Sequence, residues 1–367
     1  MRRATRNFFL GGVGIGSEHP VSVQTMCNTR TADVGATLAQ IAAVAAHGCD
    51  IIRVSVDTEA DVGALRTICK ESPLPVVADI QFSGETALTA IAAGVAGVRL
   101  NPGIIHDRGL LKRIAEAAVA AGTVIRVGAN AGSLKPRSVE AEAARGLSRN
   151  EAVAAALVAA VEEQCAILEG FGVTKIKAAL KSSEIPVTLE AYRRFAARND
   201  YPLHLGLTEA GTPDRGEINS AVCIGTLLNS GIGDTVRVSL TADPVREVAA
   251  AVKILEACGL RGGDVKLVSC PTCGRTEVDL IGLAEKVEQL LRSARRNGRT
   301  VRWRKIAVMG CPVNGPGEAR DADLGIAGSR NGQLVIFRKG EVVGAYPEAE
   351  GFAVFAEMIA SGDAAGE

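Results

Sequence analysis

Aromatic residues are scarce in this sequence: Phe, Tyr and Trp make up 3% of the 367 residues, whereas hydrophobic residues in total make up 47%. A core built from Ala, Val, Leu and Ile is typical of α/β proteins with buried parallel strands. Net charge is also absent, because the 41 basic and 41 acidic residues cancel. The composition therefore gives no support for a general nucleic-acid or polyanion binder.

No hydrophobic run reaches the length of a transmembrane helix, and the basic residues 1–6 are not followed by the apolar stretch of a signal peptide. We therefore expect a cytoplasmic protein. Disulfides are rare in the cytosol, so metal binding or catalysis explains clustered cysteines better than pairing does. Five of the nine cysteines lie in apolar or helical stretches and are interpreted as small buried hydrophobic residues: Cys49, Cys69, Cys165, Cys223 and Cys258.

Short β-like runs alternate with Ala-rich helical stretches over the first two thirds of the chain. Such alternation predicts right-handed βαβ units, and eight of them fit a (β/α)₈ barrel of the TIM type. A doubly wound open sheet is the alternative, but no nucleotide-binding glycine loop follows the first strand. The glycines at 11–16 precede that strand and are interpreted as a flexible entry turn. The expected strands are 21–26, 50–56, 75–80, 97–101, 123–129, 175–180, 202–208 and 234–240.

A second, smaller domain is expected after the barrel. We place the barrel at residues 1–258, a linker at 259–264 and an α+β domain at 265–367. Strands at 265–269 and 305–309 each lead into a loop that carries cysteine, so the two loops are expected at one end of a small sheet. Further strands are expected at 324–327, 333–338 and 341–345, with helices at 279–295 and 349–361.

Cationic residues recur near the ends of the expected barrel strands, where catalytic side chains of such barrels collect. Their number predicts a small anionic substrate, one bearing phosphate, held by arginines. The alternative is a set of structural ion pairs with Asp50, Asp57, Asp79, Glu209 and Asp234. The polar residues at the strand ends are Arg53, Arg99, Asn101, Arg126, Asn130, Lys175, Lys177, Lys181, His204, Glu209, Arg237 and Ser239. Because Lys175 and Lys177 share a strand face, at least one of them is expected to be structural.

Glu209 ends a strand and enters a glycine turn among these cations. A carboxylate in that position suits general acid or base catalysis. A surface carboxylate or a counter-ion is the alternative interpretation.

Three cysteines lie in the second domain: Cys270 and Cys273 in a Cys-x-x-Cys loop, and Cys311 in a Gly/Pro loop that ends at Glu318. Structural zinc needs four Cys or His ligands, and this domain contains no histidine. A thioredoxin-like disulfide leaves Cys311 unexplained. An iron–sulfur cluster with three thiolates and one other ligand uses all four residues.

These motifs resemble the 4-hydroxy-3-methylbut-2-en-1-yl diphosphate synthase family of the methylerythritol phosphate route to isoprenoids. The matching stretches run in order along nearly the whole chain. They are residues 48–54, 77–80, 101–103, 128–134, 201–206, 208–211, 231–241, 269–276 and 309–320.

The resemblance implies a (β/α)₈ barrel followed by a cluster domain like that of sulfite and nitrite reductases. It implies reductive ring opening and dehydration of 2-C-methyl-D-erythritol 2,4-cyclodiphosphate by an iron–sulfur oxidoreductase. Flavodoxin or ferredoxin would deliver the electrons. It also implies a homodimer in which the cluster domain of one subunit caps the barrel of the other.

The resemblance also assigns roles to residues of this sequence. Cys270, Cys273, Cys311 and Glu318 would hold a [4Fe–4S] cluster, and Glu318 would yield its position to the substrate. Glu209 would be the acid that assists the loss of oxygen. The substrate would be held by Arg53, Arg99, Arg126, Asn130, Lys181, His204, Arg237, Ser239 and Asn314.

The chain departs from the family pattern at Gln81, where histidine is common, at Ile104, where asparagine is common, and at Cys27, where threonine is common. Two other functions are weighed against the reductase: a zinc-stabilised barrel that binds a phosphorylated ligand without redox chemistry, and an electron carrier with the barrel as scaffold. The zinc alternative leaves Glu318 unexplained, and the carrier alternative leaves the cations unexplained.

Overall fold

The computed structural model describes residues 2–80, 84–101, 107–261, 265–296 and 301–361, without the side chains of residues 295, 296, 314, 316, 318 and 331. The chain divides into two compact units, Met1–Arg261 and Gly262–Glu367. Gln81 and Ile104, where the sequence departs from the family pattern, lie outside the described residues. No helix in the described part of the chain is long and apolar enough to cross a membrane.

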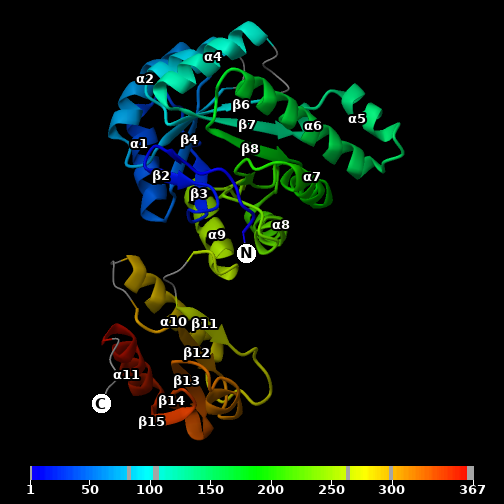
Figure 1. The fold of residues 1–367 in the computed structure, drawn as a ribbon. Coiled ribbons are helices and arrows are strands. Elements are labelled where there is room, and N and C mark those ends of the chain that lie inside the picture. Colours follow the sequence, from blue (N-terminus) through cyan, green and yellow to red (C-terminus); the bar gives the residue numbers. More distant parts are fainter. Residues whose placement is uncertain (1, 81–83, 102–106, 262–264, 297–300, 362–367) are drawn as a thin grey trace. The chain divides into compact units, whose positions relative to one another are not determined.

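The first unit is a ring of parallel strands (Figure 1). An isolated parallel bridge between Ala178 and Leu203 joins β8 to the start of β9 and closes the ring. This confirms the predicted (β/α)₈ barrel. The last two strands are much shorter than expected. In chain order the strands are β3 (Ser22–Met26), β4 (Ile51–Ser55), β5 (Val76–Asp79), β6 (Gly97–Leu100), β7 (Val124–Asn130), β8 (Ile176–Lys181), β9 (His204–Leu205) and β10 (Thr235–Val236).

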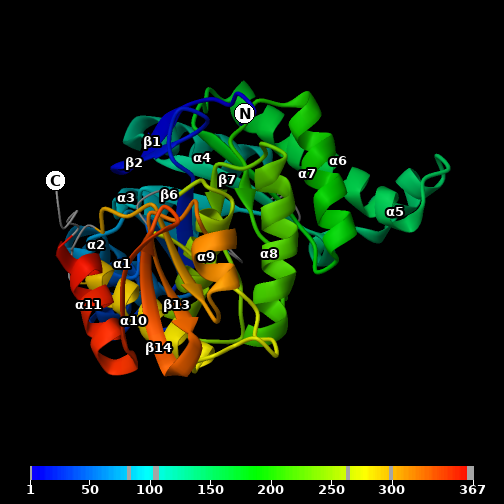
Figure 2. The same cartoon turned by 90° about the horizontal axis from the view of Figure 1, so that it is seen from below.

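Helices follow the strands and cover the outside of the ring (Figures 1 and 2). Local sequence fixes where several of them begin: Thr58 and Asp61 form a reciprocal capping box on α2, and Asp107 caps α4. The helices are α1 (Val34–Ala46), α2 (Glu59–Glu71), α3 (Gly84–Ala92), α4 (Arg108–Ala121), α6 (Arg149–Gly170), α7 (Ile185–Arg198), α8 (Pro213–Asn229) and α9 (Pro244–Ala257). A short 3₁₀ turn, η1 (Ala131–Ser133), and an additional helix, α5 (Pro136–Ala143), precede α6.

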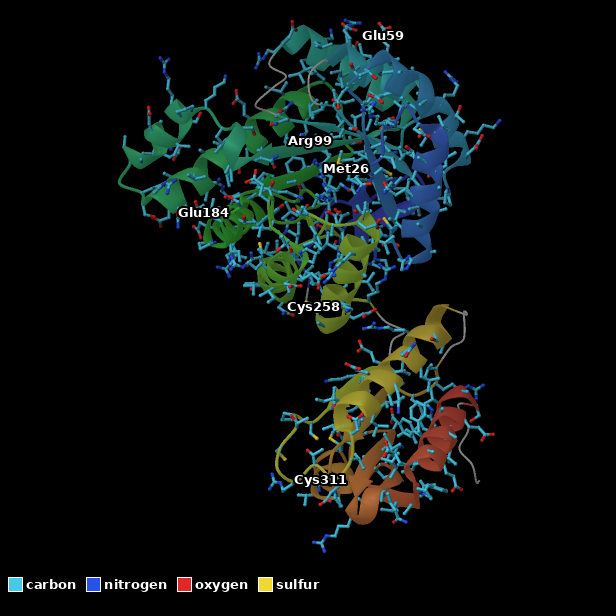
Figure 3. All side chains as sticks on the ribbon, turned by 180° about the vertical axis from the view of Figure 1, so that it is seen from behind. Met26, Glu59, Arg99, Glu184, Cys258 and Cys311 are labelled. Atoms are coloured by element: carbon cyan, nitrogen blue, oxygen red, sulfur yellow. The ribbon has the colours of Figure 1, made fainter. Side chains whose placement is uncertain are left out.

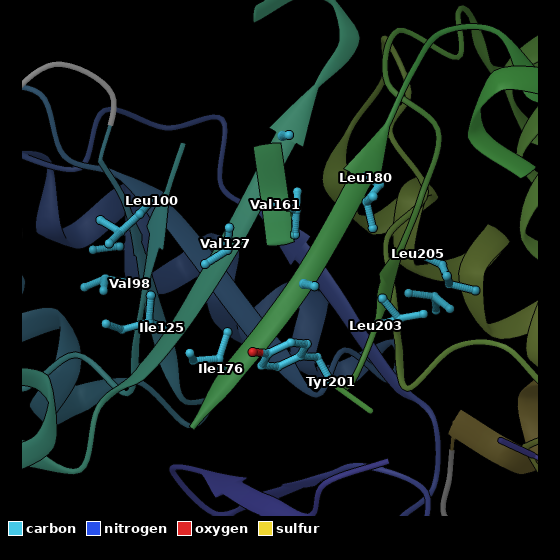
Figure 4. Close-up of a cluster of buried hydrophobic side chains, with 14 of the residues drawn as sticks. Val98, Leu100, Ile125, Val127, Val161, Ile176, Leu180, Tyr201, Leu203 and Leu205 are labelled. Atoms are coloured by element: carbon cyan, nitrogen blue, oxygen red, sulfur yellow. The ribbon is translucent and has the colours of Figure 1, made fainter. Parts of the chain in front are cut away.

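Alternate residues of each barrel strand face the helices and form the hydrophobic core. On β8 these are Ile176, Ala178 and Leu180, all fully buried, and Figure 4 shows Ile176 and Leu180 within the core cluster. Because successive side chains of a strand point to opposite faces, Lys177, Ala179 and Lys181 point into the barrel.

A β-hairpin that the sequence analysis missed covers the N-terminal end of the barrel. It consists of β1 (Phe8–Leu10) and β2 (Val13–Ile15), and its turn includes Gly11 with φ of 57°. Leu10 and Ile15 pack on Ile51, Val77 and Val124, which lie at the starts of β4, β5 and β7. The glycines at 11–16 therefore belong to an ordered hairpin, and their interpretation as a flexible entry turn was wrong.

The second unit is a five-stranded sheet with neighbour order β11-β12-β13-β14-β15. The first three strands are parallel and the last two are antiparallel, as an α+β domain requires. Its core contains Trp303, whose ring nitrogen donates to the carbonyl of Met358 at 3.0 Å. The elements are β11 (Lys266–Ser269), α10 (Leu280–Arg296), β12 (Lys305–Met309), the π-helical turn η2 (Val313–Glu318), β13 (Leu324–Ser329), the 3₁₀ turn η3 (Arg330–Gly332), β14 (Gln333–Arg338), β15 (Glu341–Pro347) and α11 (Glu348–Ser361).

Candidate active site

Charged residues occupy one row across the inside of the barrel. Strand register places Asp79 beside Arg99, Arg99 beside Arg126, and Arg126 beside Lys177, on β5 to β8 in turn. All four side chains are buried. The interior layers of such barrels are usually filled by branched apolar residues, so this row indicates a site rather than packing alone.

Asp79 is the carboxylate that organises the row. Its two oxygens lie 3.2 Å from Nη1 of Arg99 and 3.7 Å from Nε of Arg53. Burial alone would raise the pKa of Asp79, but Arg53, Arg99 and Arg126 outweigh it and lower the pKa. Asp79 therefore stays ionised and offsets part of the positive charge.

Two arginines in or next to the row, Arg126 and Arg53, are destabilised in their charged forms. Burial, opposed by Asp79, lowers the pKa of Arg53 to about 10. Burial, and then Arg53 and Arg99, hold the pKa of Arg126 well below its ordinary value. A carboxylate or phosphate beside these guanidinium groups would relieve both effects, since an opposite charge favours the charged form.

Several buried donors in the barrel have no hydrogen-bond partner among the described residues: Nε and Nη1 of Arg126, Nε of Arg99, Nζ of Lys177 and Nε2 of His204. Leaving buried donors unpaired is costly unless a ligand or ordered water satisfies them. Gly128 follows Arg126 on the same face of β7, and a Cβ there would lie 3.5 Å from Nε of both Arg99 and Arg126. The glycine keeps side-chain bulk away from the guanidinium groups.

A second group of cations lies beside β3. Nε and Nη2 of Arg53 donate to the sulfur of Met26 at 3.2 and 3.1 Å. Arg237, just after β10, forms an ion pair with Glu247 of α9 at 3.5 Å. Met26 and Arg99 both lie within the barrel unit in Figure 3. A thioether accepts hydrogen bonds weakly and carries no charge, so it holds Arg53 without neutralising it.

Lys181 and His204 complete the polar interior. Nζ of Lys181 approaches Gly206, where a Cβ would come within 2.6 Å of it. Burial, followed by Arg126 and Arg237, holds the pKa of Lys181 well below its ordinary value. His204 is fully buried, its Nδ1 lies 2.7 Å from Oγ1 of Thr235, and burial together with Lys181 lowers its pKa strongly, so the imidazole is neutral.

The remaining candidates lie at the C-terminal ends of the strands. Asn130 is the last residue of β7 and is in register with Lys181, and Ser239 follows β10. Glu209 is exposed and has φ of 54°, a left-handed conformation that is uncommon outside glycine. That conformation turns the chain sharply where the strand region ends.

Three expectations about charge pairing change with the structure. Nζ of Lys175 donates to the carbonyl of Gly122 at the opposite end of the strands, so Lys175 is not part of the cationic interior. Asp234 forms an ion pair with Arg2, and Asp50 forms one with Arg261, a residue outside the barrel interior. Within the described part of the chain, Asp79 is the one of the five considered carboxylates that forms ion pairs with cations of the barrel interior.

The sequence analysis overlooked Met26 and Glu247. Met26 could have been found from alternation, because Ser22, Gln24 and Met26 share the inward face of β3. Glu247 sits in the first turn of a helix after the eighth strand, and no sequence pattern connects it to Arg237.

In the second unit, Cys270 and Cys311 follow neighbouring parallel strands. Ser269 of β11 is in register with Val308 of β12, so both loops leave the same edge of the sheet, as expected. The backbone N–H of Gly310 donates to Sγ of Cys270 at 3.2 Å, and that of Glu277 donates to the carbonyl of Gly310 at 2.9 Å. These bonds tie the Cys-x-x-Cys loop to the Cys311 loop.

The three thiols differ in their surroundings. Cys273 is exposed, and a hydrogen bond from the backbone of Arg275 lowers its pKa. Cys311 is buried, whereas Cys270 is partly exposed beside an apolar group that includes Met309 and Ala327. Figure 3 shows Cys311 in the second unit.

No three His, Cys, Asp or Glu side chains in the described part of the chain are close enough to hold a metal ion as placed. Asn314 and Glu318 belong to η2, and their side chains lie outside the described residues. The structure therefore brings the loops of Cys270 and Cys311 together and leaves the fourth predicted ligand undescribed.

Two family models cover these units. The model of the GcpE TIM-barrel domain matches residues 5–252, and the model of the GcpE protein C-terminal domain matches residues 266–361. The chain belongs to the GcpE family. This confirms the resemblance found in the sequence.

Relatives of this chain are named 4-hydroxy-3-methylbut-2-en-1-yl diphosphate synthase (flavodoxin). The protein from Corynebacterium diphtheriae is 48% identical over 350 residues, which cover 95% of this chain and 86% of the relative. The protein from Geobacter sulfurreducens is 48% identical over 350 residues, covering 95% of each chain. Among solved structures, the N-acetylneuraminic acid synthetase of Leptospira borgpetersenii is similar with a TM-score of 0.50 at 14% identity, covering 81% of this chain and all of that chain. That similarity reflects the fold alone.

Proposed function

We propose that this chain is a 4-hydroxy-3-methylbut-2-en-1-yl diphosphate synthase, an iron–sulfur oxidoreductase of isoprenoid precursor synthesis. Its substrate is 2-C-methyl-D-erythritol 2,4-cyclodiphosphate. Two electrons and a proton enter, the ring carbon–oxygen bond breaks, and a hydroxyl leaves as water. The observation that carries the proposal is the cationic barrel interior with unpaired buried donors, in a chain 48% identical to synthases of that name over 95% of its length.

The barrel supplies the binding of the anion. Arg53, Arg99, Arg126, Lys181 and Arg237 supply positive charge, and Asp79 and Glu247 hold three of the arginines in place. Asn130, Ser239 and His204 add neutral hydrogen-bonding groups at or near the strand ends. Fixed donors placed before the ligand arrives bind a diphosphate without reorganisation, which is the basis of electrostatic preorganisation.

The cysteine loops fit an iron–sulfur cluster. Iron–sulfur clusters are held by thiolates, and hydrogen bonds to sulfur tune them. The Gly310 N–H on Cys270 and the lowered pKa of Cys273 are features of such a site. Cys270, Cys273, Cys311 and Glu318 would hold a [4Fe–4S] cluster, which would supply electrons one at a time, and Glu318 would be its exchangeable ligand.

Other residues would act on the substrate directly. Glu209 would donate a proton to the departing oxygen from its position at the strand end. Asn314, in the same turn as Glu318, would contact the substrate from the cluster side.

The names of the relatives support flavodoxin as electron donor, with ferredoxin as the alternative. We further propose a homodimer in which the barrel of one subunit works with the cluster domain of the other. Closing a site in this way would exclude water from the reduced substrate.

Purification without oxygen tests the proposed function. We expect about four iron and four sulfide per chain and a visible spectrum that changes when cyclodiphosphate is added. Stoichiometric zinc without iron would contradict the redox function. Iron and sulfide without a spectral response to cyclodiphosphate would indicate an electron carrier.

Glu209→Gln tests the assigned acid. The amide has nearly the same shape but cannot donate a carboxylic proton, so turnover should fall about 100-fold or more while iron content and substrate affinity remain. The rate of product formation, with a reduced flavodoxin or ferredoxin as electron donor, measures this turnover. The matched control is Glu116→Gln, which changes a 60% exposed carboxylate on α4 and should leave turnover unchanged. Full turnover in Glu209→Gln would show that another group donates the proton.

A further inference from the structure

Lys177 is buried beside Arg126 near the start of β8. Its side chain is 1% exposed, and its Nζ has no hydrogen-bond partner among the described residues. The neighbouring residues Ile176 and Ala178 face the helices, so Lys177 points into the barrel. Strand register places it beside Arg126, and the same two strands end at the register pair Asn130 and Lys181.

The charged groups around Lys177 come from several strands. Arg126 on β7 and Arg53 on β4 disfavour a positive charge on Lys177, and Lys177 in turn disfavours a charge on His204 of β9. Asp234, just before β10, is the attractive group, but its oxygens already accept from Arg2 at 2.8 Å, Thr5 at 3.1 Å and the N–H of Leu203 at 2.8 Å. Lys177 thus has a carboxylate nearby that is fully engaged elsewhere.

An ammonium group in such surroundings loses hydration without gaining a partner. Burial, followed by repulsion from Arg126, lowers the pKa of Lys177 to about 7. Near neutral pH the unliganded barrel therefore contains both neutral and charged Lys177.

Resting on the proposed function, we propose that Lys177 is a positioning residue that takes up a proton when an anion binds to the neighbouring arginines of the barrel interior. Protonation adds a positive charge beside Arg126 when the negative charge of the ligand arrives. Without a ligand, Lys177 can stay neutral, so the barrel contains one buried cation fewer. With an anion bound, Lys177 is protonated and contributes a positive charge. Affinity for the anion then depends on pH through a residue that is not required to touch the ligand.

The sign of the pH effect follows from linkage. A bound anion stabilises the charged form of Lys177, so its pKa is higher in the complex than the free value of about 7. Below pH 7 the lysine is charged in both states and affinity does not depend on it. Above pH 7 binding requires proton uptake, so the dissociation constant should rise up to about tenfold per pH unit until the pKa of the complex is reached.

Titration calorimetry of the intact iron-loaded protein with the cyclodiphosphate tests this, in buffers that differ in ionisation enthalpy. The wild type at pH 8 should take up about one proton more per barrel than Lys177→Met, since the methionine is of similar length and cannot ionise. Protons released or bound by the ligand itself cancel in that difference. The dissociation constant of Lys177→Met should stay level between pH 7 and 9, where that of the wild type rises.

Lys175→Met is the matched control. Lys175 is on the same chain segment, two residues earlier, and its Nζ bonds to the carbonyl of Gly122 outside the site. The control should keep the proton uptake and the pH slope of the wild type. The thermal midpoint of unliganded Lys177→Met should equal or exceed that of the wild type, because the substitution removes an unpaired buried amine.

The outcomes separate this inference from the proposed function. If the wild type binds cyclodiphosphate but proton uptake and pH slope are the same in Lys177→Met, the role of Lys177 is overturned and the function stands. If the wild type binds no cyclodiphosphate while inorganic diphosphate binds with the expected proton difference, the substrate assignment fails and the role of Lys177 as an anion-linked group stands. A thermal midpoint lowered by Lys177→Met, with no change in uptake, would mark the lysine as purely structural.

Discussion

The two ends of the barrel are built from the same strands and have opposite chemistry. At the N-terminal end the inward residues Ile51, Val77 and Val124 pack on the β1–β2 hairpin. Two residues further along the same strands the inward residues are charged: Arg53, Asp79 and Arg126. On each of these strands, a step of two residues separates the apolar end, called the plug below (the β1–β2 hairpin with Ile51, Val77 and Val124), from the charged site.

The same strands therefore contribute to stability at their N-terminal ends and to ligand binding at their C-terminal ends. Apolar burial at the plug stabilises the fold by about 25 cal/mol per Å², whereas burying cations without partners costs stability. The cations are tolerated because the plug and the outer hydrophobic core hold the strands in place. Stability should therefore respond to substitutions at the N-terminal end, and ligand affinity to substitutions at the C-terminal end.

The largest effect should follow from damaging the plug. Leu10→Ala removes a side chain that is 1% exposed and packed on the strand starts, so the free energy of unfolding should fall by about 2–5 kcal/mol. Denaturant unfolding measures this, with KM for the cyclodiphosphate unchanged at 25 °C. Phe9→Ala on the same strand is the control, because Phe9 is 57% exposed, and it should change stability far less. A raised KM in Leu10→Ala would contradict the inference that the N-terminal end affects stability and not ligand affinity.

A smaller effect, on catalysis and not on stability, should follow from removing one cation. Arg126→Met should lower kcat/KM about 100-fold, which corresponds to about 2.7 kcal/mol. The thermal midpoint should not fall, since Nε and Nη1 of Arg126 have no partners in the described part of the chain and its charge is repelled by Arg53 and Arg99. Steady-state kinetics and thermal unfolding on the same preparation measure both. A lower midpoint with unchanged kinetics would show that Arg126 is a structural residue.

Much of the barrel could be predicted because its strands are short apolar runs between amphipathic helices. Eight strands were expected and eight are present, although β9 and β10 have only two residues each in the ladder. The hairpin escaped prediction because each of its strands has three residues, too few for alternation to be recognised among glycines. Its role depends on contacts with strands far along the chain, which local pattern does not contain.

The sequence predicted which residues form the site but not which of them pair with one another. Alternation identifies Arg53, Arg99 and Arg126 as inward residues, whereas the pairing of Asp79 with two of them depends on register between strands. The position of Lys175 was misjudged because it precedes its strand and faces the other end of the barrel. In the second unit, each cysteine loop follows a strand, and that pattern correctly predicted that two loops leave one edge of the sheet.

Residues 2 and 3 bind the segments that flank β9 and β10, the strands at which the barrel closes. Arg3 donates to the carbonyls of Asn199 and Tyr201, its backbone N–H donates to Gly231, and Arg2 binds Asp234. These contacts flank β9 and β10, the two shortest barrel strands, and join residues nearly two hundred or more positions apart. During synthesis, these long-range contacts can form only after residues 199–234 have left the ribosome. Ring closure should therefore be a late event in folding, and the amides of β9 and β10 should be the first in the barrel to exchange with solvent.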